Sequence, residues 1–209
     1  MRTHAFVAES VSADIVAKGY AIIDHLLPEA ILFELKARFE ELQQEDEFHK
    51  AGIGKQLHYT IDKSVRGDFI RWIDPKDTEA ITYALFEYIN ELIVTLNRTC
   101  FLGIKDYETH YAFYPQGKGY LMHRDRFQNN PHRIISYVYY LNDNWQQGDG
   151  GELVLYNENE QPIETIAPLG NRLAVFLSET LHEVRNCNTE RRSITGWLLN
   201  IPTTLTFLG

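Results

Sequence analysis

The sequence contains little cysteine and no long apolar run. Only Cys100 and Cys187 occur among 209 residues, which excludes a disulfide framework and predicts reduced thiols. No apolar stretch approaches the roughly 18 residues of a membrane-spanning helix. The first residues, MRTHAFVAESVSADI, lack the apolar core of a secretory signal. Together these absences predict a cytoplasmic protein with no membrane partner.

Basic residues and phosphate-binding motifs are also scarce. Lys and Arg number 20 against 29 Asp and Glu, a net charge of −9, whereas nucleic-acid binders need a basic face. We therefore expect no nucleic-acid partner. Neither a phosphate-binding GxxxxGK[ST] loop nor a GxSxG serine nucleophile motif occurs. HRDRFQNN at 123–130 has the spacing of a kinase catalytic loop, but the Gly-rich loop and DFG motif of kinases are missing.

What is present is an ordinary globular composition, with 44% hydrophobic and 23% charged residues. The length suits one structural domain, and no repeat or low-complexity linker divides it. Within that domain we expect three stretches. Residues 1–104 would form a helical support region with a mobile loop at about 49–71, residues 105–201 the core of the domain, and residues 202–209 a tail.

The hydrophobic period changes along the chain. In the first half it is mostly helical, with Ser12 expected to cap a short helix that stops at Gly19 and GYAIIDHLL expected as a strand after it. A second helix follows Pro28, and a third is expected over about 78–98. After Gly103 the period becomes two, which predicts about eight short strands separated by turns. We therefore predict an α+β fold, with a β-sandwich, jelly roll or barrel behind N-terminal helices.

Three residues of this strand-rich half could bind a metal. His123 and Asp125 stand two apart on a predicted strand, so their side chains would share one face. His182, at the start of another predicted strand, supplies a third ligand type. Two histidines and one carboxylate form the facial triad of non-haem Fe(II) oxygenases. The alternatives at this point are ordinary surface residues or a zinc hydrolase, because zinc also takes these ligands.

Arg191 stands nine positions after His182, across the turn NCNTE. If the two flanking strands form a hairpin, Arg191 and His182 lie at neighbouring strand ends. Ser193 would share the face of Arg191. A buried guanidinium beside a hydroxyl suits one carboxylate of a dicarboxylate, while a metal chelates its other end. A 2-oxo acid such as 2-oxoglutarate has this form.

Several blocks of sequence then resemble one family. They are VRGDFIRWID, FYPQGKGYLMHRD, YYLNDNW, GGELVLY, LHEV and RRSITGW. The chain resembles the iron- and 2-oxoglutarate-dependent dioxygenases, in the prolyl-hydroxylase-domain branch, and among these the bacterial prolyl 4-hydroxylases. The resemblance implies a double-stranded β-helix (jelly-roll) core. It also implies Fe(II), 2-oxoglutarate and O2, with ascorbate as a reductant.

The resemblance assigns roles residue by residue. The implied iron ligands are His123, Asp125 and His182. The residues matched to the 2-oxoglutarate pocket are Arg191, Tyr114, Tyr140, Val138, Leu153, Val184 and Thr195. Those matched to the substrate side are Tyr120, Trp197, Arg66 and Asp68. No catalytic side chain beyond the iron centre is implied. Arg124 and Arg126, which flank the ligand aspartate, depart from the pattern of the animal enzymes.

The activity implied is hydroxylation of a prolyl residue at C4 in a protein substrate, with release of succinate and CO2. The bacterial relatives suggest a translation elongation factor, elongation factor Tu, as that substrate, and we expect a monomer. Two alternatives stay open. One is a 2-oxoglutarate oxygenase acting on a small molecule, and the other is a non-catalytic β-sandwich binding module.

Overall fold

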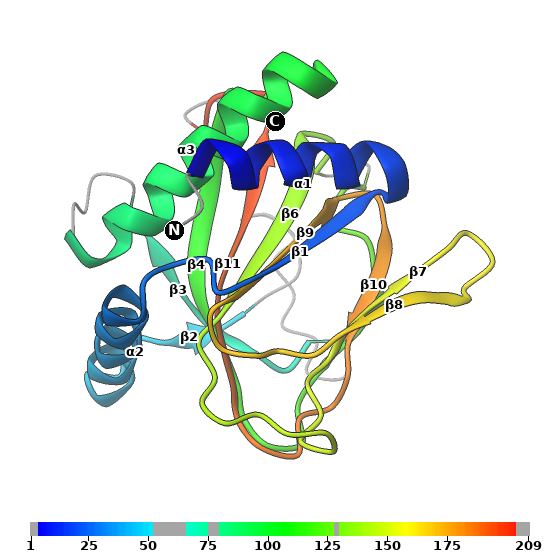
Figure 1. Cartoon of the computed structure of the whole chain (residues 1–209). Helices are drawn as coiled ribbons and strands as arrows, with labels where there is room; N and C mark the ends of the chain where they lie inside the picture. The colour runs from blue at the N-terminus through cyan, green and yellow to red at the C-terminus, as the bar shows by residue number, and fades with distance from the viewer. Residues whose placement is uncertain (1–3, 52–65, 75–79, 128–129, 204–209) are drawn as a thin grey trace.

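The computed structural model describes residues 4–51, 66–74, 80–127 and 130–203 (Figure 1). Three helices occur in these ranges: α1 (His4–Lys18), α2 (Glu29–Gln44) and α3 (Ala80–Cys100). Eight strands follow α3: β4 (Asp106–Tyr114), β5 (Tyr120–His123), β6 (Arg133–Tyr140), β7 (Leu153–Tyr156), β8 (Pro162–Ile166), β9 (Arg172–Leu177), β10 (Leu181–Val184) and β11 (Arg191–Leu199). Three further strands precede α3: β1 (Tyr20–Asp24), β2 (His49–Lys50) and β3 (Phe69–Ile73).

The helices follow the hydrophobic stripes of the sequence. In α2 the buried residues are Leu32, Leu35, Phe39 and Leu42, three and four apart. The prediction for Ser12 was wrong, because α1 already begins at His4 and Ser12 lies inside it. Its hydroxyl donates to the carbonyl of Glu9, a bond within the helix rather than a cap.

The strands form two antiparallel sheets. The larger has seven strands in the order β1-β9-β6-β11-β4-β3-β2, and the smaller has four in the order β5-β10-β7-β8. Antiparallel strands that alternate between two facing sheets are the hallmark of the jelly roll. The predicted fold class, an α+β protein with a double-stranded β-helix core, is confirmed.

The first hundred residues contribute to the large sheet as well as to its helical cover. β1 pairs with β9 over five residue pairs, and β3 pairs with β4. α1 and α3 lie across one face of this sheet (Figure 1), and their side chains join the largest hydrophobic cluster. The opposite face of the sheet is left for the smaller sheet. The division at residues 104 and 201 stays a prediction.

The segment expected as a mobile loop, about 49–71, is described only at its two ends. β2 and β3 pair with each other there, and residues 52–65 lie outside the described part of the chain. Among the helices that are described, none combines the length and apolar character needed to cross a membrane.

Packing of α3 against the sheet should supply a measurable share of stability. We expect Leu92→Ala to lower the free energy of unfolding by about 2–5 kcal/mol, because Leu92 is fully buried and its loss leaves a cavity. Val94→Ala, on the exposed side of the same helix, should change it by less than about 0.5 kcal/mol. Urea unfolding of both variants measures the difference, and equal losses would contradict this packing.

Candidate active site

A pocket opens between the two sheets, and side chains from both line it. Most of the residues singled out in the sequence meet there. Those that line the pocket are Arg66, Asp68, Tyr114, Tyr120, His123, Asp125, Val138, Leu153, His182, Val184, Arg191, Thr195 and Trp197. Tyr140 does not line it but lies fully buried behind it, beside Arg191.

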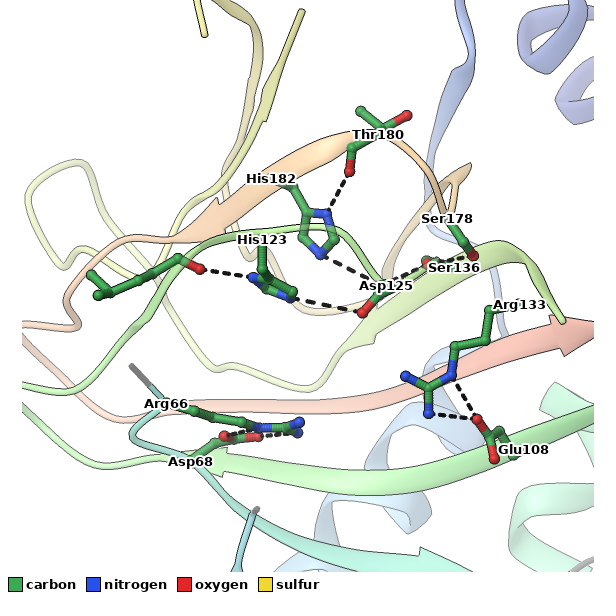
Figure 2. A network of polar contacts seen from close by, with 11 residues as sticks. Arg66, Asp68, Glu108, His123, Asp125, Arg133, Ser136, Ser178, Thr180 and His182 are labelled. Carbon is green, nitrogen blue, oxygen red and sulfur yellow. Dashed lines mark hydrogen bonds and ion pairs between the residues drawn. The ribbon is translucent and has the colours of Figure 1, made fainter. Parts of the chain in front are cut away.

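His123, Asp125 and His182 converge in this pocket (Figure 2). Each offers one ligand atom, and these atoms all lie within 4.8 Å of one another. The Nε2 atom of His123 lies 3.7 Å from Oδ1 of Asp125, and Nε2 of His182 lies 3.5 Å from Oδ2. Antiparallel pairing of β5 with β10 sets His182 directly opposite His123. The cluster is the donor set of a facial triad.

The route by which Asp125 reaches the cluster differs from the prediction. β5 ends at His123, so Asp125 lies in the loop beyond the strand. The alternation of side chains along a strand therefore does not explain why His123 and Asp125 face the same way. The Asp125 carboxylate instead accepts a hydrogen bond from the Ser136 hydroxyl on β6.

Both imidazole rings are held through Nδ1. That atom in His123 lies 2.8 Å from the carbonyl oxygen of Leu121, and in His182 it lies 2.8 Å from that of Thr180. A carbonyl only accepts hydrogen bonds, so each Nδ1 carries the proton and each Nε2 keeps a free lone pair. Bonds of this kind fix the tautomer and ring orientation of histidines that bind metals.

Burial and neighbouring charge hold two of these groups in the protonation state a metal needs. Burial, with the adjacent His182, lowers the pKa of His123 to about 3. For Asp125, burial alone would raise the pKa, but His182 and His123 outweigh it and hold the pKa below its ordinary value. A neutral imidazole and an ionised carboxylate are the forms that bind cations.

Arg191 occupies the other end of the pocket and is 3% exposed. Its guanidinium donates to the carbonyl of Gly151 at 3.0 Å and to the Ser193 hydroxyl at 3.3 Å. It lies 5.0 Å from the ring centroids of both Tyr114 and Tyr140. Gly151 has φ +75°, and a side chain there would meet Arg191. No carboxylate of the described residues pairs with this buried charge, so it suits an anionic ligand.

The predicted hairpin between the strands of His182 and Arg191 was wrong. β10 belongs to the smaller sheet and β11 to the larger, so the two residues face one another across the pocket instead. Residues of β11 two apart share one face, so Arg191 and Thr195, which line the pocket, lie on either side of the buried Ser193. This face of β11 therefore forms one wall of the pocket.

The walls fit a chelating keto acid. Val138, Leu153 and Val184 supply apolar surface between Arg191 and the histidines. The Tyr140 hydroxyl is buried next to Arg191, and no described residue accepts a hydrogen bond from it. A buried donor without an acceptor is costly unless a ligand supplies one. A carboxylate beside Arg191 would do so.

Arg66 and Asp68, which also line the pocket, form a two-bond ion pair at 2.6 and 2.9 Å. The Arg66 guanidinium lies 4.9 Å from the Tyr120 ring centroid, and Tyr120 stacks on the His123 ring with centroids 3.5 Å apart. Trp197 lies under the Arg133 guanidinium at 3.5 Å. The described end of the segment before β3 is thereby connected to the triad.

Among the residues of this region that sequence reasoning left unassigned, three are polar: His110, Ser136 and Ser178. His110 and Ser136 line the pocket, and Ser178 contacts Ser136. The alternation of β4 and β6 could have identified the first two, since they share a face with Tyr114 and Val138. Ser178 lies in a turn after β9, where no periodic signal exists.

The metal-free protein should lose stability on acidification from pH 7 towards pH 5. Burial lowers the pKa of His110, helped by Arg66 and Arg133, and burial with His182 lowers that of His123. The unfolded chain takes up protons on both near pH 6.5 while the folded chain does not, so the free energy of unfolding falls as pH drops. Urea unfolding at pH 7, 6 and 5 measures this slope.

A pair of variants identifies the source of the slope. His110→Phe removes one of the two buried groups and should flatten the pH dependence. His25→Gln removes an exposed histidine and should leave it unchanged. An unaltered slope in His110→Phe would show that this histidine does not contribute.

Comparisons with known proteins agree with this geometry. Residues 109–199 match the family described as the 2OG-Fe(II) oxygenase superfamily. The crystal structure of a Pseudomonas putida prolyl-4-hydroxylase is 34% identical, covers 93% of this chain and all of its own, and superposes with a TM-score of 0.83. A Trichoplax adhaerens prolyl hydroxylase, solved with a hypoxia inducible factor peptide, is 27% identical over 94% of this chain and 90% of its own, with a TM-score of 0.84.

Curated relatives point the same way. The Mus musculus prolyl hydroxylase EGLN3 is 28% identical over 86% of this chain and 77% of its own length. The Rattus norvegicus Egl nine homolog 1 is 32% identical over 65% of this chain, a match that spans 42% of that relative. The triad and the keto-acid pocket supply the donor set that Fe(II) and 2-oxoglutarate require. The chain belongs to the prolyl hydroxylase branch of the 2OG-Fe(II) oxygenase superfamily and uses these two cofactors.

Proposed function

We propose that this protein hydroxylates C4 of a prolyl residue within a protein substrate, using 2-oxoglutarate and O2. The observation that carries the proposal is a single pocket that holds a three-ligand metal cluster and, on the opposite sheet, a buried guanidinium that no described carboxylate neutralises. A zinc hydrolase would have no use for Arg191. A binding module without catalysis would have no use for the triad.

In this proposal His123, Asp125 and His182 hold Fe(II) on one side, through two neutral imidazoles and one carboxylate. A facial set of three ligands leaves the remaining coordination positions for reactants. Bound Fe(II), with 2-oxoglutarate and O2, supplies the oxidising chemistry that yields succinate, CO2 and a hydroxylated carbon. No side chain of the pocket then needs to act as a general base.

The protein's own contribution is to orient and to exclude water. Arg191, with the Tyr140 hydroxyl, would grip the distal carboxylate of 2-oxoglutarate by charge-assisted hydrogen bonds. Val138, Leu153 and Val184 would enclose its carbon chain and keep water from the reacting end. Thr195 and Tyr114 complete the wall on the β4 and β11 side.

The substrate side would be formed by Tyr120, Trp197 and the Arg66–Asp68 pair, which line the same pocket as the triad. An aromatic pair beside the metal suits the apolar ring of proline. The Trichoplax adhaerens relative was solved with a peptide, which supports a peptide substrate here. Among proteins, we propose a translation elongation factor, elongation factor Tu, on the basis of the resemblance to bacterial prolyl 4-hydroxylases.

Mass spectrometry tests the proposal. The purified protein, loaded with Fe(II) and 2-oxoglutarate, is incubated in air with elongation factor Tu, with a proline-containing peptide from it, and with free proline. We expect one proline of the protein and its peptide to gain the mass of one oxygen atom, matched by succinate formation. His123→Ala serves as the blank. Turnover of free proline alone would favour a small-molecule oxygenase, and no succinate with any substrate would contradict the proposal.

A further inference from the structure

We propose that Ser136 and Ser178 are positioning residues, which fix the orientation of the Asp125 carboxylate through a closed ring of hydrogen bonds. The inference rests on the proposed role of Asp125 as a metal ligand. It concerns the orientation of the Asp125 carboxylate in the metal-free protein.

The hydrogen bonds of the ring lie in the interior (Figure 2). The Ser136 hydroxyl donates to Oδ2 of Asp125 at 2.7 Å, and the Ser136 and Ser178 hydroxyl oxygens lie 2.9 Å apart. Ser136 is 1% exposed and Ser178 is fully buried. A buried hydroxyl held at both sides has little freedom to turn away, so the carboxylate has a defined partner.

The direction of these bonds follows from counting protons. An ionised carboxylate only accepts, so Ser136 gives its single hydroxyl proton to Asp125. The contact between the two serines must then be a donation from Ser178 to the Ser136 oxygen. A chain of hydroxyls that points one way polarises along its length and strengthens the last bond.

The backbone closes the ring. The carbonyl of Ser178 accepts from the amide of Arg126 at 2.8 Å, and the Ser178 amide donates to the carbonyl of Ile134 at 3.0 Å. Arg126 directly follows Asp125 in the chain. Asp125 is therefore held from two directions, through its side chain by Ser136 and through its neighbour's backbone by Ser178.

Asp125 needs such support because it lies beyond the end of β5. No strand ladder sets its backbone, and the last torsion of an aspartate side chain is soft. Oδ2 accepts the hydrogen bond of Ser136 and lies 3.5 Å from Nε2 of His182, while Oδ1 has no hydrogen bond from Ser136 and lies 3.7 Å from Nε2 of His123. The serines thus present one carboxylate oxygen to a cation.

The turn that carries Ser178 also orients a second ligand. Thr180, two residues later, supplies the carbonyl that holds Nδ1 of His182. The turn is fastened to the Asp125 segment by the two flanking arginines. Arg124 donates to the carbonyl of Glu179, and Arg126 lies 3.6 Å from the Glu179 carboxylate. This gives the two unusual arginines a structural role.

Metal binding to the metal-free protein tests the inference without turnover. Mn(II) affinity is measured by electron paramagnetic resonance for the unaltered protein, Ser136→Ala, Ser178→Ala and Ser136→Thr. Loss of a residue that supports a metal ligand weakens metal binding by about 10–100-fold, and we expect Ser136→Ala in that range. Ser178→Ala should lose less, and Ser136→Thr, which keeps the hydroxyl, should recover most of the affinity. Ser12→Ala, a buried serine in α1, is the control.

The outcomes separate this inference from the proposed function. If the unaltered protein does not bind Mn(II) more tightly than Asp125→Asn does, the metal site itself is wrong. Suppose instead that the unaltered protein binds Mn(II) more tightly than Asp125→Asn, but Ser136→Ala and Ser178→Ala bind it as tightly as Ser12→Ala. The two serines then do not position Asp125, and the inference is wrong. Thermal unfolding of the metal-free variants identifies any that fail to fold. If Ser136→Ala is one of them, the Mn(II) affinities of Ser178→Ala and Ser136→Thr test the inference.

Discussion

Asp125→Asn should abolish succinate formation and weaken Mn(II) binding by more than about 100-fold. Loss of a residue that only supports a metal ligand weakens metal binding by about 10–100-fold, and loss of the ligand itself should weaken it more. The substitution keeps the shape of the side chain and removes its negative charge. An amide is a poorer ligand for a divalent cation, and the pocket then holds only two imidazoles. Isothermal titration with Mn(II) and a succinate assay measure the two effects.

Asp143→Asn is the matched control for this change. Asp143 is an exposed carboxylate paired with Lys36, on the surface near α2. Its replacement should leave both metal binding and turnover as they are. Unchanged Mn(II) affinity in Asp125→Asn would mean that this carboxylate is no ligand, whatever its place in the cluster.

Arg191→Met should raise the KM for 2-oxoglutarate by about 100-fold, because removing one partner of a buried charge pair costs about 2–5 kcal/mol and 1.4 kcal/mol is tenfold. The methionine keeps apolar volume but cannot bind a carboxylate. Mn(II) affinity should not change, since Arg191 lies away from the triad on the opposite sheet. Initial rates at varied 2-oxoglutarate measure the KM.

Two further arginine variants sharpen that result. Arg185→Met alters an exposed arginine just after β10 and should leave the KM unchanged. Arg191→Lys keeps the charge without the paired donors of a guanidinium, so its KM for 2-oxoglutarate should lie between that of the unaltered protein and that of Arg191→Met. A normal KM in Arg191→Met would show that the cosubstrate carboxylate is held elsewhere.

Much of the fold could be predicted from local patterns. The stripe of α2 and the alternation after Gly103 follow directly from which residues must be buried in a helix or a strand. The start of α1 could not, because Ser12 suits a cap and also tolerates a helix interior by bonding to Glu9. The pairing of β1 and β3 with the large sheet depends on residues far away in the chain.

The residues of the site could be predicted from the sequence, but the elements that carry them and the pairing of those elements could not. His123, Asp125, His182 and Arg191 could be singled out by chemistry and resemblance, and the structure brings all four to one pocket. The strand placement of Asp125 and the hairpin before Arg191 were both wrong. Each rested on local geometry, while the actual contacts cross between two sheets.

By themselves, the residues determined the period of each segment, the class of fold and the set of groups able to bind iron and a keto acid. Only the tertiary structure decided that β5 pairs with β10, that the turn after β9 contacts Ser136 and the backbone next to Asp125, and that no described carboxylate neutralises Arg191. The reason is physical. Side-chain period is a property of neighbouring residues, whereas sheet register, burial and unpaired charge arise when distant segments exclude water from one another.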